Sequence, residues 1–344
     1  MSTDTALCSM TQPNTLKKTI TISAILTGSL VIVSLISLLE GTTSVGFSDL
    51  LSSIFHKIDS NQGSTIIFSY RLPRILLACV VGAGLACSGV VFQGVLRNPL
   101  ADPYIIGIAA GGALGAVVSI SLFKWNGLFS TSIASFVGSL VAVGLVYGLT
   151  VLRKNSSYIN TVILAGIIVG SMMNSMMLLI MSVTSSHELQ RVLFWMMGDF
   201  SLADYEKILF SGTVVLIGFL VIYLNANRLN VLSLGEESAS NLGIDVQKYR
   251  FFLIIVAALM TGSVVSVAGP IGFVGLVAPH SMRLLFGSDH RVLLPTAFLS
   301  GALFLVIADT IARLVAYPVE LPVGVITALS GAPFFLYLLL KNRN

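Results

Sequence analysis

The sequence predicts an all-α polytopic membrane protein with about ten transmembrane helices in two inverted five-helix halves and with both termini in the cytoplasm. Three observations lead to this fold class. First, 55% of the 344 residues are hydrophobic and 10% are charged, and the mean hydropathy is +0.94. A water-soluble domain of this composition would expose far too much apolar surface. The other two observations are long apolar runs and an uneven distribution of basic residues.

Apolar runs recur along the chain at lengths that suit a bilayer. The first is twenty residues without a charge, enough to cross a hydrocarbon core of about 30 Å as a helix that rises about 1.5 Å per residue. The eighth is too short to span a membrane unaided. In chain order the predicted helices cover residues 20–39, 75–96, 104–123, 128–152, 158–181, 208–224, 251–267, 276–285, 292–308 and 323–340.

Basic residues are concentrated in alternate predicted loops. If the N-terminus is cytoplasmic, passage through ten helices places twelve of the nineteen lysines and arginines inside, with only six of the fifteen acids. This excess follows the positive-inside rule, so we expect both termini in the cytoplasm. The net charge of +4 therefore reflects topology and gives no reason to expect a nucleic-acid partner.

The ends of the apolar runs divide the chain into a short tail and one large domain. We expect a polar, disordered tail over residues 1–18 and a single transmembrane domain over 19–344. The first apolar run is too long for a usual signal peptide and no small-residue cleavage site follows it, so it remains an uncleaved helix. The long outside loops are 40–74 and an amphipathic stretch, 185–207.

Small residues indicate how the helices pack. A glycine–serine–glycine pattern recurs 178 residues later, and because five helices separate the copies, a true repeat would be inverted. The corresponding residues are Gly84 and Gly262, Ser88 and Ser266, and Gly94 and Gly272. Glycines spaced four apart let helix backbones approach closely; these are Gly107, Gly111, Gly115, Gly166 and Gly170.

Methionines crowd two adjacent stripes of the predicted helix at 158–181. Methionine fills irregular gaps in a core, and it also suits a soft wall along a pathway for a bulky solute. Both interpretations stay open from the sequence. The pathway candidates are Met173, Met177 and Met181.

Four segments interrupt the apolar pattern with proline, glycine or clustered polar residues. They are RLPR at 71–74, RNPLADP at 97–103, LNVLSLGEESASNLGIDV at 229–246 and GPIGFVGLVAPHSMRLLFGSDHR at 269–291. Breaks at membrane depth normally line a cavity or face protein, because their backbone groups need partners. Together the four segments resemble the permease subunits of binding-protein-dependent ABC importers for iron–siderophore, haem and vitamin B12 (cobalamin), the FecCD-type or type II family. The resemblance extends from the first helix to Lys341.

The resemblance implies that loop 229–246 is a cytoplasmic coupling loop that folds into two short helices and sits in a cleft of an ATPase subunit. Its residue types fit this role: leucine and alanine offer an apolar face, glycines permit turns, and paired glutamates favour a helix start. A simple solvated loop is the alternative. The residues assigned to coupling are Leu232, Leu234, Gly235, Glu236, Glu237, Ala239, Leu242 and Gly243.

The family's outside arginines correspond to Arg71, Arg74 and Arg313, for which the resemblance implies docking to acidic residues of a solute-binding protein. Arginines that extend to lipid headgroups are the alternative. At the inner end, the resemblance implies a cytoplasmic gate formed by Asn98 and Leu100, with Asn160 from the loop before the fifth helix. These residues could also simply end helices.

Nucleotide chemistry is absent from the chain itself. No glycine–lysine pair occurs, so there is no phosphate-binding G-x-x-x-x-G-K-[ST] loop. We therefore expect a non-enzymatic transport subunit without cofactor or metal, with ATP and Mg on a partner. The four scattered histidines do not indicate a metal site and do not select a substrate.

The implied function is that of an inner-membrane permease for an iron–siderophore, haem or cobalamin-type solute. The implied assembly is a homodimer of permeases with two ATPase subunits, a solute-binding protein outside and lipid around it. An ion-coupled secondary transporter is the main alternative, although such proteins usually place charges within their helices. A receptor or channel scaffold explains neither the inside loop nor the broken helices.

Overall fold

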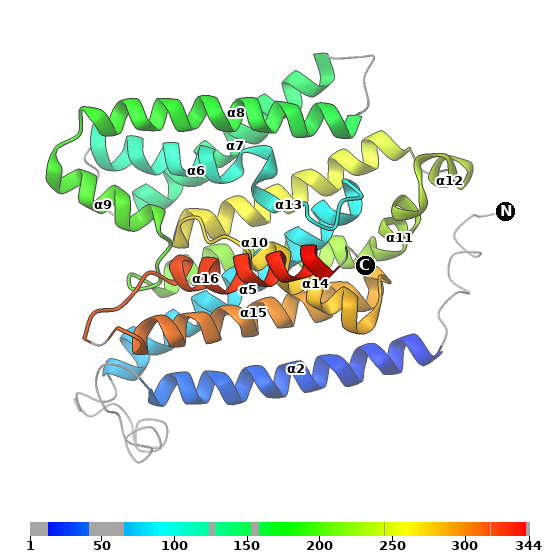
Figure 1. Cartoon of the computed structure of the whole chain (residues 1–344), viewed down its shortest axis with the longest axis horizontal. Coiled ribbons are helices and arrows are strands. Elements are labelled where there is room, and N and C mark those ends of the chain that lie inside the picture. Colours follow the sequence, from blue (N-terminus) through cyan, green and yellow to red (C-terminus); the bar gives the residue numbers. More distant parts are fainter. Residues whose placement is uncertain are drawn as a thin grey trace.

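The computed structural model describes residues 13–40, 65–123, 128–152, 158–243, 245–316 and 318–341. Throughout these ranges the regular secondary structure is helical (Figure 1). The helices are α2 (Pro13–Leu39), η2 (Ile66–Arg71), α5 (Leu72–Val95), η3 (Pro103–Ile106), α6 (Ile108–Val117), η4 (Val118–Leu122), α7 (Leu128–Leu152), α8 (Tyr158–Ser182), α9 (Ser186–Met196), α10 (Tyr205–Leu224), α11 (Ala226–Leu234), α12 (Glu236–Asn241), α13 (Val246–Ala268), α14 (Val274–Phe286), α15 (His290–Leu314) and α16 (Val323–Lys341).

A helix lies at each of the ten predicted positions. Seven of the described helices are long and apolar enough to cross a membrane alone, and the segments 108–122, 274–286 and 323–337 are shorter apolar helices. The sequence predicts only one short helix, at 276–285. The third predicted helix is shortened because Gly107 takes a left-handed conformation (φ 77°) that separates η3 from α6. This break leaves the segment 108–122 too short to span a bilayer unaided.

The tail is shorter than expected. Helix α2 begins at Pro13, so residues 13–18 are helical and not part of a disordered tail. Proline is favoured in the first turn of a helix, where its missing N–H is not needed. Lys18 then donates from Nζ to the carbonyl oxygen of Phe286 at 2.9 Å, at the C-terminal end of α14. Residues 1–12 and most of the predicted outside loop, 41–64, lie outside the described residues.

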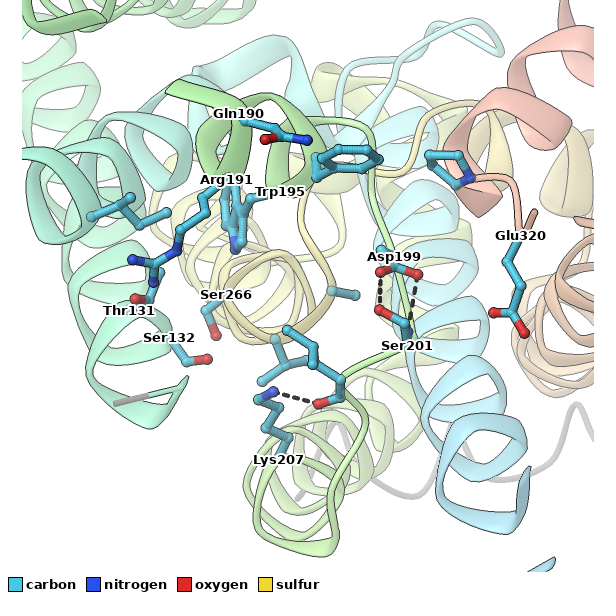
Figure 2. Close-up of a pocket in the computed structure, with 16 residues that line it drawn as sticks. Thr131, Ser132, Gln190, Arg191, Trp195, Asp199, Ser201, Lys207, Ser266 and Glu320 are labelled. Atoms are coloured by element: carbon cyan, nitrogen blue, oxygen red, sulfur yellow. Dashed lines mark hydrogen bonds between the residues drawn. The ribbon is translucent and has the colours of Figure 1, made fainter. Parts of the chain in front are cut away.

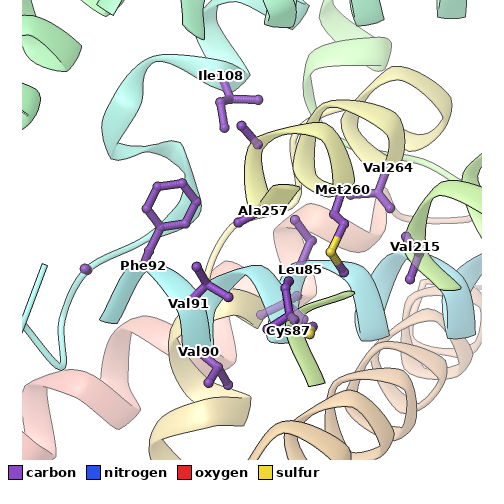
Figure 3. Packing of buried hydrophobic residues seen from close by; sticks show 14 of the residues in the cluster. Leu85, Cys87, Val90, Val91, Phe92, Ile108, Val215, Ala257, Met260 and Val264 are labelled. Atoms are coloured by element: carbon purple, nitrogen blue, oxygen red, sulfur yellow. The ribbon is translucent and has the colours of Figure 1, made fainter. Parts of the chain in front are cut away.

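The core is built around α5, with α13 and α15 on either side (Figure 1). In α5, 83% of the most apolar window is buried, against 11% in α2, which covers α15 from outside. Figure 3 shows part of this core, in which α5 residues from Leu85 to Phe92 share one cluster with Ile108 of α6, Val215 of α10 and Met260 of α13. Consequently α5, α13 and α15 are enclosed by protein, whereas α2 and most of α8 present apolar surface outward.

Glycines allow the closest helix contacts. A Cβ atom on Gly89 of α5 would overlap the carbonyl oxygen of Gly275 in α14, and one on Gly82 would overlap that of Gly301 in α15. The predicted close packing is confirmed at Gly111 and Gly115, which touch α7, and at Gly166, which touches η3. At these contacts the helix backbones approach each other directly, which small residues permit.

The break between α13 and α14 is satisfied by protein groups. The hydroxyl of Tyr104 accepts from the N–H of Ile271 and donates to its carbonyl oxygen, both at 3.0 Å. The N–H of Asp199 donates to the carbonyl oxygen of Ala268 at 3.0 Å. Broken backbone at membrane depth requires such partners. The start of α2, the end of α16 and the α11–α12 loop lie at the same end of the bundle (Figure 1).

The proposed repeat is only partly matched. Ser88 and Ser266 both lie in central helices, α5 and α13, and Ser88 donates to the carbonyl oxygen of Ala257 at 3.1 Å, which ties the two helices together. Gly94 belongs to the last turn of α5, however, whereas Gly272 lies in the break after α13. The inverted arrangement of two halves therefore stays a prediction, as does the cytoplasmic position of both termini.

Candidate functional site

Loop 229–246 folds into the end of α11, the short helix α12 and the start of α13, at one end of the bundle (Figure 1). The predicted apolar face divides into two. Leu232 and Ala239 are 1% and 0% exposed and pack in the core of the chain itself, so the prediction that they face a partner is wrong. Leu234 and Leu242, in contrast, are 74% and 63% exposed. Helical spacing places Leu232 and Leu234 on different faces of α11.

The polar residues of this loop define its turns. Gly235 (φ 140°) separates α11 from α12 and Gly243 (φ 77°) follows α12, so both take the conformations that the turn prediction requires. Glu237 is exposed on the first turn of α12. Glu236 pairs with Arg250 of α13, and the hydrogen bond from Arg250 lowers the pKa of this carboxyl. The loop is thus attached to the domain by α12 as well as by its apolar side.

The α11–α12 loop has a second attachment, to the start of α15, that the sequence did not lead us to predict. Asn230 of α11 donates from Nδ2 to Asp289 Oδ1 at 2.8 Å, and its Oδ1 accepts from the backbone N–H of His290 at 2.9 Å. Burial tends to raise the pKa of Asp289, but hydrogen bonds from Arg291 and Asn230 outweigh it and hold this pKa at about 2. One signal in the sequence was an asparagine between leucine and valine in a short apolar helix.

At the opposite end of the bundle, an ion-pair cluster joins α5, α15 and the segment before α16. Arg74 binds Asp309 at 2.9 Å and also pairs with Glu320. Arg313 lies 3.3 Å from the other oxygen of Asp309. Asp309 is only 1% exposed, whereas the side chain of Glu320 is 36% exposed. The structure therefore brings two of the predicted docking arginines together, around a carboxylate that was not singled out for this role.

The three predicted docking arginines are buried rather than exposed. Arg71 donates to the carbonyl oxygens of Leu38 and Leu39 at 2.7 and 2.8 Å, and Arg313 also bonds Ser37 at the end of α2. Docking to a partner would need guanidinium groups that are free at the surface. These side chains instead bind groups at the end of α2 and acidic side chains of their own domain, which explains their burial. In this part of the structure they fasten α2 and α5 to α15.

The predicted gate residues occupy the turn after α5 and the start of α8. Asn98 accepts from the N–H of Leu100 at 2.9 Å and so closes a tight turn, which leaves Leu100 51% exposed. Asp102 caps η3 by accepting from the N–H of Tyr104 at 2.8 Å. Asn160 is exposed in the first turn of α8. The preceding residues 153–157, which include part of the predicted second gate loop, lie outside the described residues.

Helix α8 turns its predicted pathway residues inward. Met173 and Met177 are buried among the chain's own side chains, which contradicts an open wall at these positions, and Met181 is half-buried. The exposed face carries other residues from the same helix. They are Ser171, Met172, Asn174, Ser175 and Met176. A polar stripe on the outward face of a membrane helix is costly in lipid and indicates a protein or water-filled neighbour.

A cavity of about 570 Å³ opens beneath α9, at the end of the bundle that holds the ion-pair cluster (Figure 2). Arg191 and Trp195 of α9 lie on one side, and Lys207 of α10 lies on another. Asp199 and Glu320 add negative charge, so both signs of charge meet around an aromatic wall. The predicted amphipathic stretch 185–207 supplies α9 and much of this lining.

No cluster of three or more metal-ligating side chains occurs within the described residues. His280 packs against the rings of Phe334 and Phe335, at centroid distances of 6.4 and 5.9 Å, and His290 belongs to the Asn230 contact. His187 is exposed and His56 lies outside the described residues. The three described histidines thus lie in three different surroundings: an aromatic cluster, the Asn230 contact and an exposed position.

The comparisons with known proteins agree with this arrangement. The FecCD transport family matches residues 29–341. The cobalamin import system permease protein BtuC of Halobacterium salinarum is 43% identical over 80% of this chain and 73% of its own length. The hemin transport system permease protein HmuU of Yersinia pestis is 36% identical over 91% of this chain and 94% of its own length.

A solved structure has the same fold. A chain in an inward-facing conformation, from a protein assigned to the metal-chelate type of ABC transporter, superimposes with a TM-score of 0.83 at 34% identity, over 93% of this chain and 99% of the other. Family, relatives and fold agree on a multi-pass permease of the inner membrane whose ATPase resides on partner subunits. The chain belongs to the FecCD transport family and is an ABC transporter permease subunit.

Proposed function

We propose that this permease moves an iron–siderophore, haem or cobalamin-type solute inward through the interface of two permease copies, driven by ATP hydrolysis on two separate subunits. The α11–α12 loop carries the proposal. It holds its buried residues against the bundle and leaves Leu234, Glu237 and Leu242 on an exposed surface. Two exposed leucines beside an acid, on a loop that packs against the bundle, form an apolar patch that is more favourable in a cleft of a partner protein than in contact with water. Relatives named for cobalamin and hemin support the solute class.

The exposed face of α8 supports the homodimer and the pathway. Asn174 and Ser175 face outward near the middle of a membrane-spanning helix. A second permease copy that faces this stripe would remove it from lipid and leave a polar lining between the copies. In this proposal the flexible apolar part of that lining consists of the exposed Met172 and Met176, and no longer of the buried Met173 and Met177 that the sequence suggested. Asn98, Leu100 and Asn160 are proposed to close it at the cytoplasmic end.

Docking of a solute-binding protein is proposed at the Arg74 cluster. Because Arg71, Arg74 and Arg313 are already bonded within the chain, an acidic partner residue would have to displace Glu320 from Arg74. Glu320 is the exposed acid of the cluster and so the one that can leave. Each new exposed ion pair would contribute only about 0–1 kcal/mol, and such pairs mainly set register and speed encounter.

The test combines isolation of the complex with the energetics of uptake. The tagged chain is purified gently from its native membrane, and we expect an ATPase subunit in equal amount. Uptake of haemin, cyanocobalamin and a ferric siderophore is then compared in cells with and without the chain. ATP depletion should abolish uptake of one of these solutes. If a proton ionophore abolishes it while ATP stays high, and no ATPase copurifies, the chain is an ion-coupled secondary transporter instead.

A further inference from the structure

The coupling loop is fastened to α15 by a single side chain that uses both of its polar ends. Asn230 lies in the middle of α11, and its amide donates to Asp289 while its oxygen accepts from His290. The orientation of the amide is fixed, because the backbone N–H of His290 can only donate. His290 Nδ1 lies 2.7 Å from the same oxygen and must therefore carry its proton.

Two side chains satisfy the first N–H groups of α15. Asp289 accepts from the N–H of Arg291 at 3.0 Å, and Asn230, which belongs to α11, accepts from that of His290 at 2.9 Å. Asn230 therefore contributes a tertiary link between the coupling loop and α15. The link is closely packed: a Cβ on Gly94, in the last turn of α5, would lie 3.0 Å from His290 Nε2 and 3.3 Å from a methyl group of Leu229.

Three elements meet at this junction, which we define as Asn230, Asp289, His290 and Gly94. Helices α5 and α15 run side by side, with Gly82 against Gly301 (Figure 1). At their far end the same two helices are joined by Arg74 and Asp309. A force applied to α11 at the junction would therefore reach the Arg74 cluster through one rigid helix pair. Helix α12 follows the Gly235 turn and is attached separately, through Glu236 and Arg250.

We infer that Asn230 is the positioning residue that transmits displacement of the coupling loop to α15, and through α15 to the Arg74–Asp309 end of the bundle. The inference rests on the proposed function, because it requires an ATPase bound at the loop. Asn230 contacts neither solute nor nucleotide in this role. It acts through Asp289 and His290.

The test uses the complex of the chain with its copurified ATPase in lipid nanodiscs. Hydrogen–deuterium exchange is measured with and without ATP and vanadate, for peptides that cover residues 303–316 and 318–323. In the parent we expect deuterium uptake of these peptides to differ between the samples with and without ATP and vanadate. In Asn230→Ala we expect this difference to fall at least threefold, while the amount of bound ATPase and its hydrolysis rate stay within about twofold of the parent.

Two further variants separate transmission from folding. Asn230→Asp places two carboxylates together and should also lose the difference. Asn227→Ala, at an exposed asparagine of the same helix, is the matched control and should behave as the parent.

Three outcomes would overturn the inference. One is an Asn230→Ala complex that keeps the full difference. Another is an Asn230→Asp complex that assembles and hydrolyses ATP yet keeps the full difference. The third is a parent complex that hydrolyses ATP with no difference in these peptides. Failure of the proposed function looks different, since no ATPase would then copurify with the parent at all.

Discussion

Arg74 and Asp309 face each other at 2.9 Å across the α5–α15 contact, and both are buried. Asp309 also neutralises Arg313, so one carboxylate compensates two buried guanidinium groups. Charges removed from water are tolerated only when they are paired. This carboxylate therefore serves the architecture of the domain, and because it is already paired it is a poor candidate for ion coupling.

Replacing Asp309 should destabilise the protein strongly. Asp309→Asn leaves buried Arg313 beside a neutral amide and leaves Arg74 with Glu320 as its acidic partner; loss of one partner from a buried ion pair typically costs about 3–5 kcal/mol. Thermal unfolding in detergent should show a clear fall in Tm. The control is Glu320→Gln, which alters the exposed member of the cluster and should shift Tm little. Equal Tm values for Asp309→Asn and the parent would contradict the compensating role of this carboxylate.

The two leucines of α11 should respond in opposite ways. Leu234→Asp changes an exposed side chain and should leave Tm unchanged while the amount of copurified ATPase falls severalfold. Leu232→Ala removes buried volume and should cost about 2–5 kcal/mol, seen as a lower Tm. Retention of a full complement of ATPase by Leu234→Asp would show that the exposed leucine is not part of the contact.

Two glycine substitutions test the close helix contacts. Gly89→Ala forces a methyl group against the Gly275 carbonyl, and overpacking of this kind costs about 1–3 kcal/mol or more. Gly144 in α7 has open space around its Cβ position, so Gly144→Ala should leave Tm unchanged or raise it slightly, because alanine favours a helix. Thermal unfolding of both variants checks this contrast; a tolerated Gly89→Ala would mean that α5 and α14 can separate.

Asp102 should make stability depend on pH. Burial raises the pKa of Asp102 from 3.8 to about 6, although the N–H of Tyr104 opposes this. The folded state therefore keeps a proton that the unfolded chain has lost, so stability falls as pH rises from about 4 to about 6 and is level above. Asp102→Asn can still accept from Tyr104 and should raise stability at pH 7 by on the order of 1–3 kcal/mol.

The measurement for Asp102 is Tm against pH for parent and variant. The curves should converge near pH 4 and separate by pH 7. Asp245→Asn serves as the control at an exposed cap, where a hydrogen bond from Lys248 lowers the carboxyl pKa, so it should not reproduce the gain at pH 7. Parallel curves for Asp102→Asn and the parent would show that folding does not raise the pKa of this carboxyl.

The sequence by itself determined the position of each membrane helix, the place of the α11–α12 loop and the family. Lipid permits only backbone that is satisfied internally, so apolar runs of sufficient length become helices. The turns at Gly235 and Gly243 also followed from local chemistry. These features depend on neighbouring residues along the chain, which a single sequence contains.

The tertiary structure alone decided which face of each helix is buried. In a membrane helix nearly every residue is apolar, so hydrophobic periodicity does not distinguish Met173, which is buried, from Met172, which is exposed. Leu232 and Leu234 of α11 also looked alike, because a nine-residue helix with mixed polar and apolar residues does not show which of its faces packs on the bundle. Partners distant in sequence, such as Asn230 with Asp289 and Arg74 with Asp309, become neighbours only when α5, α11 and α15 pack together. Side-chain direction relative to those neighbours is what the sequence could not supply.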